Sequence, residues 1–204
     1  LVVKNKPMNN NPKIVITVGD EAGVGPEIIL KALASKDIPK KINILIVGNK
    51  KNLIAKYLFL KSLGIKDIKD PNELDIEDLK VSNSNIKTPS TETGNASFIY
   101  LKHAIEIVKK LSNSALVTSP ICKKLWNSAG HNYSGQTELL SEICDSQNVG
   151  MLFTAKSPFT GWRFNTLLAT THIPIREVPI KLDKNLINAK LDLLYSFCNK
   201  FKER

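Results

Sequence analysis

The chain has 204 residues, of which 42% are hydrophobic and 24% charged, and its formal net charge is +10 at pH 7. This balance is typical of a globular protein with one large or two small domains. The longest apolar runs, such as residues 42–47, are too short to cross a bilayer, so we expect no membrane-bound protein.

The basic charge does not indicate a nucleic-acid partner. Of the 29 basic residues only three are arginines, the side chain that best suits phosphate clamping and base recognition. The lysines are scattered and form no stripe interleaved with aromatic residues, so we interpret them as a solvated surface. The three cysteines, Cys122, Cys144 and Cys198, show no metal or disulfide spacing, and we expect a reducing, cytoplasmic setting.

The first half of the chain alternates between predicted strands and helices. Residues 1–12 are polar and Asn-rich, and we expect a disordered or non-native segment there. Beyond it, apolar runs predict buried strands and longer periodic stretches predict helices. The strands are expected at 13–18 and 42–48, and the helices at 26–34 and 51–63. Residues 67–93 are polar and broken by prolines, which indicates loops with at most a short strand.

The second half continues the pattern. Phe98, Leu101, Ile105 and Val108 recur at helical spacing, which predicts a helix with one buried face. Further elements are expected as strands at 115–119, 149–154 and 164–171, a helix at 137–145 and a last amphipathic helix through Leu186, Ala189, Leu193 and Phe197. Alternating strands and helices predict an α/β protein with a largely parallel sheet, extended by antiparallel final strands.

Four short stretches could carry chemistry. The first, "GDEAGVGPEI", follows a strand and opens a helix, where α/β proteins bind ligands. It matches neither the dinucleotide fingerprint nor a Walker loop, and its acidic residues disfavour a phosphate. Either the glycines only permit a tight turn, or Gly23 and Gly25 shape the turn while Asp20 and Glu21 face a cleft.

The second and third stretches lie close together in the chain. In "VTSPICKK", Thr118, Ser119 and Lys123 stand at a strand exit, which suits an anionic substrate or is an ordinary surface turn. The stretch "AGHNYSGQTELL" crowds polar side chains around two glycines before a helix. It is either a binding loop or simple helix-start chemistry at Thr137. Its polar members are His131, Tyr133, Ser134, Gln136 and Thr137.

The fourth stretch, "LLATTHIP", places His172 at the end of a predicted strand beside hydroxyl groups. A histidine there could bind a metal or move a proton, although a lone histidine is more often structural and no HxxxH partner is near. His103, by contrast, points away from the apolar face of its helix, and we interpret it as exposed to solvent.

The order and spacing of the four stretches are more specific than any one of them. From about Lys13 to the end, "KIVITVGDEAGVGPEI", "ALVTSPICKKLWNSAG", "SGQTELL" and "LLATTHIPI" together resemble the 4-hydroxythreonine-4-phosphate dehydrogenase family of vitamin B6 biosynthesis. The resemblance implies an isocitrate/isopropylmalate dehydrogenase-like fold with two α/β lobes, an active site in the cleft between them, and a homodimer. In this chain the lobes are expected at 13–130, incomplete, and 131–204, truncated.

The resemblance also implies an activity. Family members are NAD- or NADP-dependent dehydrogenases that oxidise the hydroxyl of a small phosphorylated hydroxy-amino acid, 4-phosphooxy-threonine, and the product then loses carbon dioxide. A divalent metal, zinc, magnesium or cobalt, polarises the reacting oxygen. By resemblance, His172 is a metal ligand and Thr137 binds substrate. Gln136 stands where many members have histidine, and it can bind substrate but cannot relay a proton.

Family members are longer, and the resemblance places the other metal histidines and most cofactor contacts beyond Arg204. We therefore expect the 204 residues alone to be an inactive fragment with its C-terminal part missing. Two alternatives stay open: a relative that acts on phospho-erythronate or phospho-threonate, and a non-catalytic remnant that binds a partner or a phosphorylated ligand.

Overall fold

The computed structural model describes residues 12–39, 41–81, 88–146 and 148–201. Nearly all of the segment predicted to be disordered, residues 1–12, therefore lies outside the described residues. The chain divides into two compact units, Leu1–Cys144 and Asp145–Arg204, each of which is described by itself. This division falls later than the lobe boundary at 130/131 expected from the sequence, and the assignment of two lobes stays a prediction.

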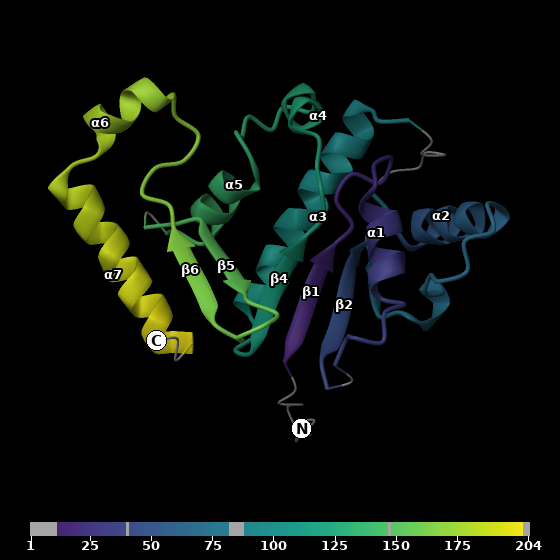
Figure 1. Cartoon of the computed structure of the whole chain (residues 1–204). Coiled ribbons are helices and arrows are strands. Elements are labelled where there is room, and N and C mark those ends of the chain that lie inside the picture. The colour runs from purple at the N-terminus through teal and green to yellow at the C-terminus, as the bar shows by residue number, and fades with distance from the viewer. Residues whose placement is uncertain (1–11, 40, 82–87, 147, 202–204) are drawn as a thin grey trace, which may run out of the picture. The chain divides into compact units, whose positions relative to one another are not determined.

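The first unit is built on a four-stranded parallel sheet in the order β3-β2-β1-β4. Figure 1 shows β2, β1 and β4 of this sheet side by side. Its strands are β1 (Lys13–Thr17), β2 (Asn43–Gly48), β3 (Ile76–Asp78) and β4 (Ser114–Thr118). The central strand β1 pairs along its whole length with both β2 and β4. Its residues are buried or half-buried on both faces, which explains why it reads as a continuous apolar run rather than an alternating one.

Each of the first three helices begins where local chemistry favours it. In α1 (Gly25–Ala32), Pro26 stands in the first turn, where its missing N–H is no loss. In α2 (Lys50–Ser62), the Asn49 side chain accepts a hydrogen bond from Asn52 N at 3.3 Å. At α3 (Thr91–Lys109), Ser90 and Thr93 form a reciprocal capping box, which satisfies two free N–H groups.

Helix α3 is buried on two faces, not on the single face that its spacing predicted. One face contributes Ala96, Tyr100 and Ala104 to the core against the sheet. Another contributes Leu101 and Ile105 to a second core. That core is completed from α4 (Lys123–Ser128) and α5 (Gln136–Ile143) by Trp126 and Leu139. Small residues on α3 allow it to contact β1, β2 and β4 closely.

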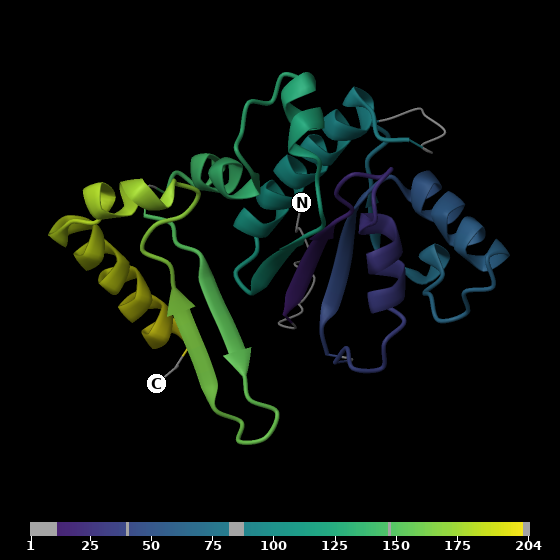
Figure 2. The same cartoon turned by 45° about the horizontal axis from the view of Figure 1, so that its top comes forward.

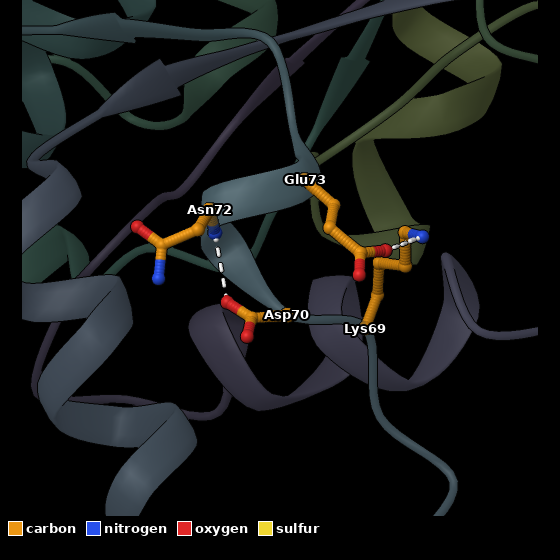
Figure 3. Close-up of polar contacts among 4 residues, drawn as sticks. All are labelled: Lys69, Asp70, Asn72 and Glu73. Carbon is orange, nitrogen blue, oxygen red and sulfur yellow. Dashed lines mark hydrogen bonds and ion pairs between the residues drawn. The ribbon is translucent and has the colours of Figure 1, made fainter.

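The polar stretch between α2 and α3 contains a short 3₁₀ helix, η1 (Pro71–Glu73), before β3. Asp70 caps it by accepting a hydrogen bond from Asn72 N at 2.9 Å, and Lys69 forms an ion pair with Glu73 across one turn (Figure 3). The predicted short strand is thus confirmed as β3, whereas the 3₁₀ helix and the start of α3 at Thr91 were not predicted in residues 67–93. His103 is half-exposed, with its Nε2 3.3 Å from Glu77 Oε1 of β3.

The second unit consists of a two-stranded antiparallel sheet and helices (Figure 2). Its elements are β5 (Leu152–Lys156), β6 (Arg163–Leu167), η2 (Ile175–Glu177), α6 (Val178–Lys181) and α7 (Lys184–Phe201). Gly150 lies between Leu167 and Leu193, so this face of the hairpin packs against α7. The two last strands pair antiparallel with each other, as expected, and their extension of the parallel sheet stays a prediction.

The α/β class with a parallel sheet is confirmed, whereas the isocitrate dehydrogenase-like two-lobed arrangement stays a prediction. Strand β6 ends at Leu167, several residues before the predicted end at 171, so His172 follows the strand at a distance. Within the described ranges, no helix is long and apolar enough to cross a membrane.

Candidate functional site

The strand order places a ligand-binding position at the carboxyl ends of β1 and β4. Strands β1 to β3 follow one another toward one edge of the sheet, and the chain then returns so that β4 pairs on the other side of β1. In open α/β sheets, ligands bind outside such a switch point. Here the loop of residues 19–25 leaves β1 beside Ser119 and Pro120, which leave β4. Two of the four predicted stretches are thereby brought together.

Two glycines allow the loop of residues 19–25 to lie close to the exit of β4. Gly19 has a φ of +72°, and a Cβ on it would lie 2.4 Å from Pro120 O. A Cβ on Gly25 would lie 2.2 Å from Val18 O and 3.2 Å from the Ser119 Cβ. Asp20 N donates to Pro120 O at 3.0 Å, and Gly23 N donates to Asp20 O at 3.0 Å. The glycines therefore shape a tight turn that is clamped onto the exit of β4.

The two acidic residues of the loop have different environments. Glu21 is 3% exposed; its Oε1 accepts a hydrogen bond from the Tyr100 hydroxyl at 2.6 Å, and its Oε2 accepts from Asn52 Nδ2 at 2.9 Å. Glu21 thus anchors the loop to α2 and α3 and does not face a cleft, which corrects half of that hypothesis. Asp20 is 5% exposed, and its Oδ1 accepts from Ala22 N at 3.0 Å.

Gln136 also contacts the exit of β4, through a hydrogen bond to Ser119. Its Nε2 donates to Ser119 O at 3.2 Å, while its Oε1 is buried with no hydrogen-bond partner among the described residues. The opposite amide orientation would set two oxygens against each other, so this orientation is the favourable one. Ser119 is 6% exposed, and its N–H donates to the Thr17 hydroxyl at 3.4 Å. Gln136 therefore belongs to the switch-point site.

The N-terminus of α5 lies next to Gln136. Thr137, the second residue of the helix, is exposed, and Gly135 before it has no side chain to cap the free N–H groups. The Lys123 ammonium and one Glu138 carboxylate oxygen both lie beside Gly135, at 3.6 and 3.2 Å from the position of a Cβ there. Free N–H groups and a lysine favour an anion, and Glu138 opposes one.

Two further polar residues of this stretch, His131 and Tyr133, have structural contacts. His131 stacks on Phe98 with ring centroids 3.6 Å apart, and its Nε2 donates to Asn95 Oδ1 at 2.8 Å. Burial, with the nearby Lys102 as a second cause, lowers the pKa of His131. The hydroxyl of Tyr133 donates to Glu142, which is the main reason that the pKa of Tyr133 is raised. These contacts hold the loop before α5 against α3.

His172 belongs to the second unit and is exposed, with a φ of +58°. Among the described residues, no group of three or more histidine, cysteine, aspartate or glutamate side chains is gathered as a metal site. His172 therefore contributes one ligand at most to any set that this part of the chain could form, and the described donors alone do not fit a complete metal centre.

Sequence reasoning missed the anchoring role of Tyr100 and Asn52. Both contact Glu21 from far along the chain, and no local spacing signals such a contact. Glu21 is a carboxylate inside an otherwise small-residue loop, which was the available hint that it needed buried donors.

Taken together, the fold and these contacts define an α/β protein with a candidate ligand-binding site at its switch point. A family model described as "Pyridoxal phosphate biosynthetic protein PdxA" matches residues 40–204. The chain belongs to this family. Its curated relatives named 4-hydroxythreonine-4-phosphate dehydrogenase include a Synechococcus protein that is 43% identical over 187 residues, 90% of this chain and 54% of the relative. A Nostoc protein of the same name is 42% identical over 196 residues, 93% of this chain and 54% of that protein.

Solved structures agree. A 4-hydroxythreonine-4-phosphate dehydrogenase from Burkholderia phymatum superposes with a TM-score of 0.73 at 26% identity, covering 89% of this chain and 56% of that one. The enzyme of the same name from Klebsiella pneumoniae gives 0.77 at 22% identity, covering 93% and 59%, and this likeness shows the fold alone. The chain spans about half the length of the curated relatives that it matches.

Proposed function

We propose that the chain is part of a 4-hydroxythreonine-4-phosphate dehydrogenase that acts in pyridoxal and pyridoxine phosphate biosynthesis. The reaction is the oxidation of 4-phosphooxy-threonine with NAD or NADP, followed by decarboxylation. The observation that carries this proposal is the family membership, with 43% identity to a relative of that name over nine-tenths of the chain. A cytoplasmic homodimer is part of the proposal.

In this proposal the first unit binds and orients the substrate. Thr137 donates its exposed hydroxyl to the substrate, and the free N–H groups of α5 together with Lys123 attract its anionic end. Gln136, fixed by its hydrogen bond to Ser119 O, orients the substrate without carrying charge. An acid–base role at position 136 is excluded because an amide has no proton to give at neutral pH.

The metal is proposed from the family resemblance, as zinc, magnesium or cobalt, and His172 is the residue of this chain that would bind it. When bound, such an ion stabilises developing negative charge on oxygen. Because the described residues do not form a complete ligand set, we derive no step through the metal. Most of the cofactor contacts and two further histidines are proposed to lie in sequence that the relatives have and this chain lacks.

Substrate binding can be tested on the chain itself. We expect Thr137→Val, which removes one hydroxyl at nearly constant volume, to weaken binding of 4-phosphooxy-L-threonine, measured by calorimetry. The matched control is Thr154→Val on the exposed face of β5, which should leave the affinity unchanged. Equal affinity of both variants would contradict the role of Thr137.

Turnover by the 204 residues with substrate, NAD and metal would contradict the proposal that they are an inactive part of the enzyme.

A second candidate, a dehydrogenase of phospho-erythronate or phospho-threonate, is favoured by one observation. Gln136, which by resemblance stands where many family members have histidine, is bonded directly to Ser119 O at the exit of β4. Calorimetric affinities for 4-phosphooxy-threonine, phospho-erythronate and phospho-threonate would decide between the two candidate functions. Tighter binding of a sugar acid than of 4-phosphooxy-threonine would favour this second candidate.

A further inference from the structure

The carboxylate of Asp20 is nearly buried and accepts one hydrogen bond from the described residues. The residue is only 5% exposed, and Oδ1 accepts a single hydrogen bond from Ala22 N. In the described part of the chain, neither a further hydrogen bond nor an ion pair reaches its other oxygen, Oδ2. A carboxylate so nearly buried normally has donors or a cation around it, because removing it from water is costly. Its neighbour Glu21, which is equally buried, has two such donors.

A second side chain, Gln136, is held at the same strand exit and also has an acceptor oxygen without a hydrogen-bond donor. Asp20 N is bonded to Pro120 O, and Gln136 Nε2 is bonded to Ser119 O, so both residues are held on successive carbonyls of one strand exit. Gln136 Oε1 is buried with no donor among the described residues. Both unsatisfied atoms can only accept hydrogen bonds.

We propose that Asp20 is a ligand-binding residue that accepts a hydrogen bond from a hydroxyl or ammonium group of a small molecule at the switch point. Glu21 beside it is the anchor that holds the loop, and Asp20 is the contact. This assignment rests on the proposed function. The donor group has two possible sources there, the hydroxyl and ammonium of the phosphorylated amino acid and the ribose hydroxyls of the dinucleotide.

The site favours a donor over a phosphate. Asp20 and Glu21 both repel an anion, and the two side-chain atoms that lack a donor, Asp20 Oδ2 and Gln136 Oε1, are both acceptors. An ionised acceptor bonded to a ligand donor contributes roughly ten- to a hundredfold in affinity. Asparagine at this position would keep the bond from Ala22 N and the shape of the side chain, but would lose the charge and turn the second oxygen into an amide donor.

The test is calorimetry on the whole chain with 4-phosphooxy-L-threonine, NAD and inorganic phosphate as separate probes. We expect Asp20→Asn to weaken one of the first two by about tenfold or more. The probe that is weakened identifies the source of the donor. The control Asp67→Asn makes the same change at an exposed carboxylate and should leave all affinities unchanged. Circular dichroism and the melting temperature verify that each variant folds.

Several results would overturn the assignment. Unchanged affinity for both organic probes would show that Asp20 does not touch the ligand, as would an equal loss in Asp67→Asn. If the unchanged chain binds neither organic probe, the proposed binding of substrate by the first unit fails, and the assignment fails with it. If the unchanged chain binds them and Asp20→Asn makes no difference, the assignment alone fails.

Discussion

At the scale of single residues, the loop of residues 19–25 shows how neighbours in sequence acquire different roles. Asp20 and Glu21 have the same charge and similar burial, yet Glu21 has the Tyr100 hydroxyl at 2.6 Å and Asp20 has only one backbone donor. The sequence offered no way to distinguish them. Distant donors from α2 and α3 made the difference, because hydrogen-bond satisfaction of a buried carboxylate depends on what packs around it.

A pH prediction also belongs at this scale. Because burial, and secondarily Lys102, lowers the pKa of His131 below its ordinary 6.5, the unfolded chain binds more protons than the folded one just below that pH. The contribution of His131 to the free energy of unfolding is therefore complete above pH 6.5 and falls as the pH drops toward the pKa of the folded state.

The pKa of His131 can be measured by NMR titration of its ring in the unaltered chain and in Lys102→Met. Removing the ammonium should raise the pKa of His131 toward 6.5, since one of its two causes is lost. Lys66→Met, at an exposed lysine elsewhere on the first unit, serves as the control and should leave the titration unchanged. A midpoint for His131 above 6.5 in the unaltered chain would refute the argument.

At the scale of elements, helix α3 organises the first unit because it packs on two sides. Its apolar spacing indicated the face with Leu101 and Ile105, but the face toward the sheet consists largely of small residues such as Ala96 and Ala104. Small side chains give a weak periodic signal although they allow the closest packing. Trp126 of α4 completes the arrangement by donating its Nε1–H to Ser97 Oγ at 2.7 Å.

Gly94 provides the test at this scale. A Cβ on it would lie 2.6 to 2.7 Å from the side chain and backbone of Leu125, so α3 and α4 can approach only because this residue is glycine. We expect Gly94→Ala to lower the free energy of unfolding by about 1–3 kcal/mol, measured in urea, despite the better helix propensity of alanine.

The control for Gly94→Ala is Glu92→Ala, at an exposed position in the first turn of the same helix, which should change stability far less. A higher free energy of unfolding in Gly94→Ala would show that helix α4 can move away without a cost in stability. It would contradict the packing argument for this glycine.

At the scale of the whole molecule, the two units differ in how completely their side chains are buried. The first has a core of fully buried side chains on both sides of α3. None of the described side chains in Asp145–Arg204 is buried, and large apolar groups there are widely exposed. They include Phe153, Phe159, Trp162, Phe164, Ile175 and Ile180. A two-stranded hairpin with so little buried surface is marginally stable by itself.

Native-state hydrogen exchange should reveal this difference. We expect the amides of β1 and β2 to exchange only through global unfolding, and those of β5 and β6 to exchange faster by local opening. The comparison is internal, since both sets of amides are measured in one sample. Equal protection of Val15 and Phe164 would show that the second unit is as stable as the first, against this expectation.

The sequence by itself determined the α/β class, most element positions in the first unit, and the family, because strand runs, helix starts and the four motifs are local properties of the chain. It also brought Gln136 and the glycine loop to attention. Only the tertiary structure decided that the loop and the exit of β4 share one site, that Glu21 is an anchor, and that α3 is buried twice. Those facts depend on strand order and on contacts between residues up to a hundred positions apart, and no local pattern encodes such contacts.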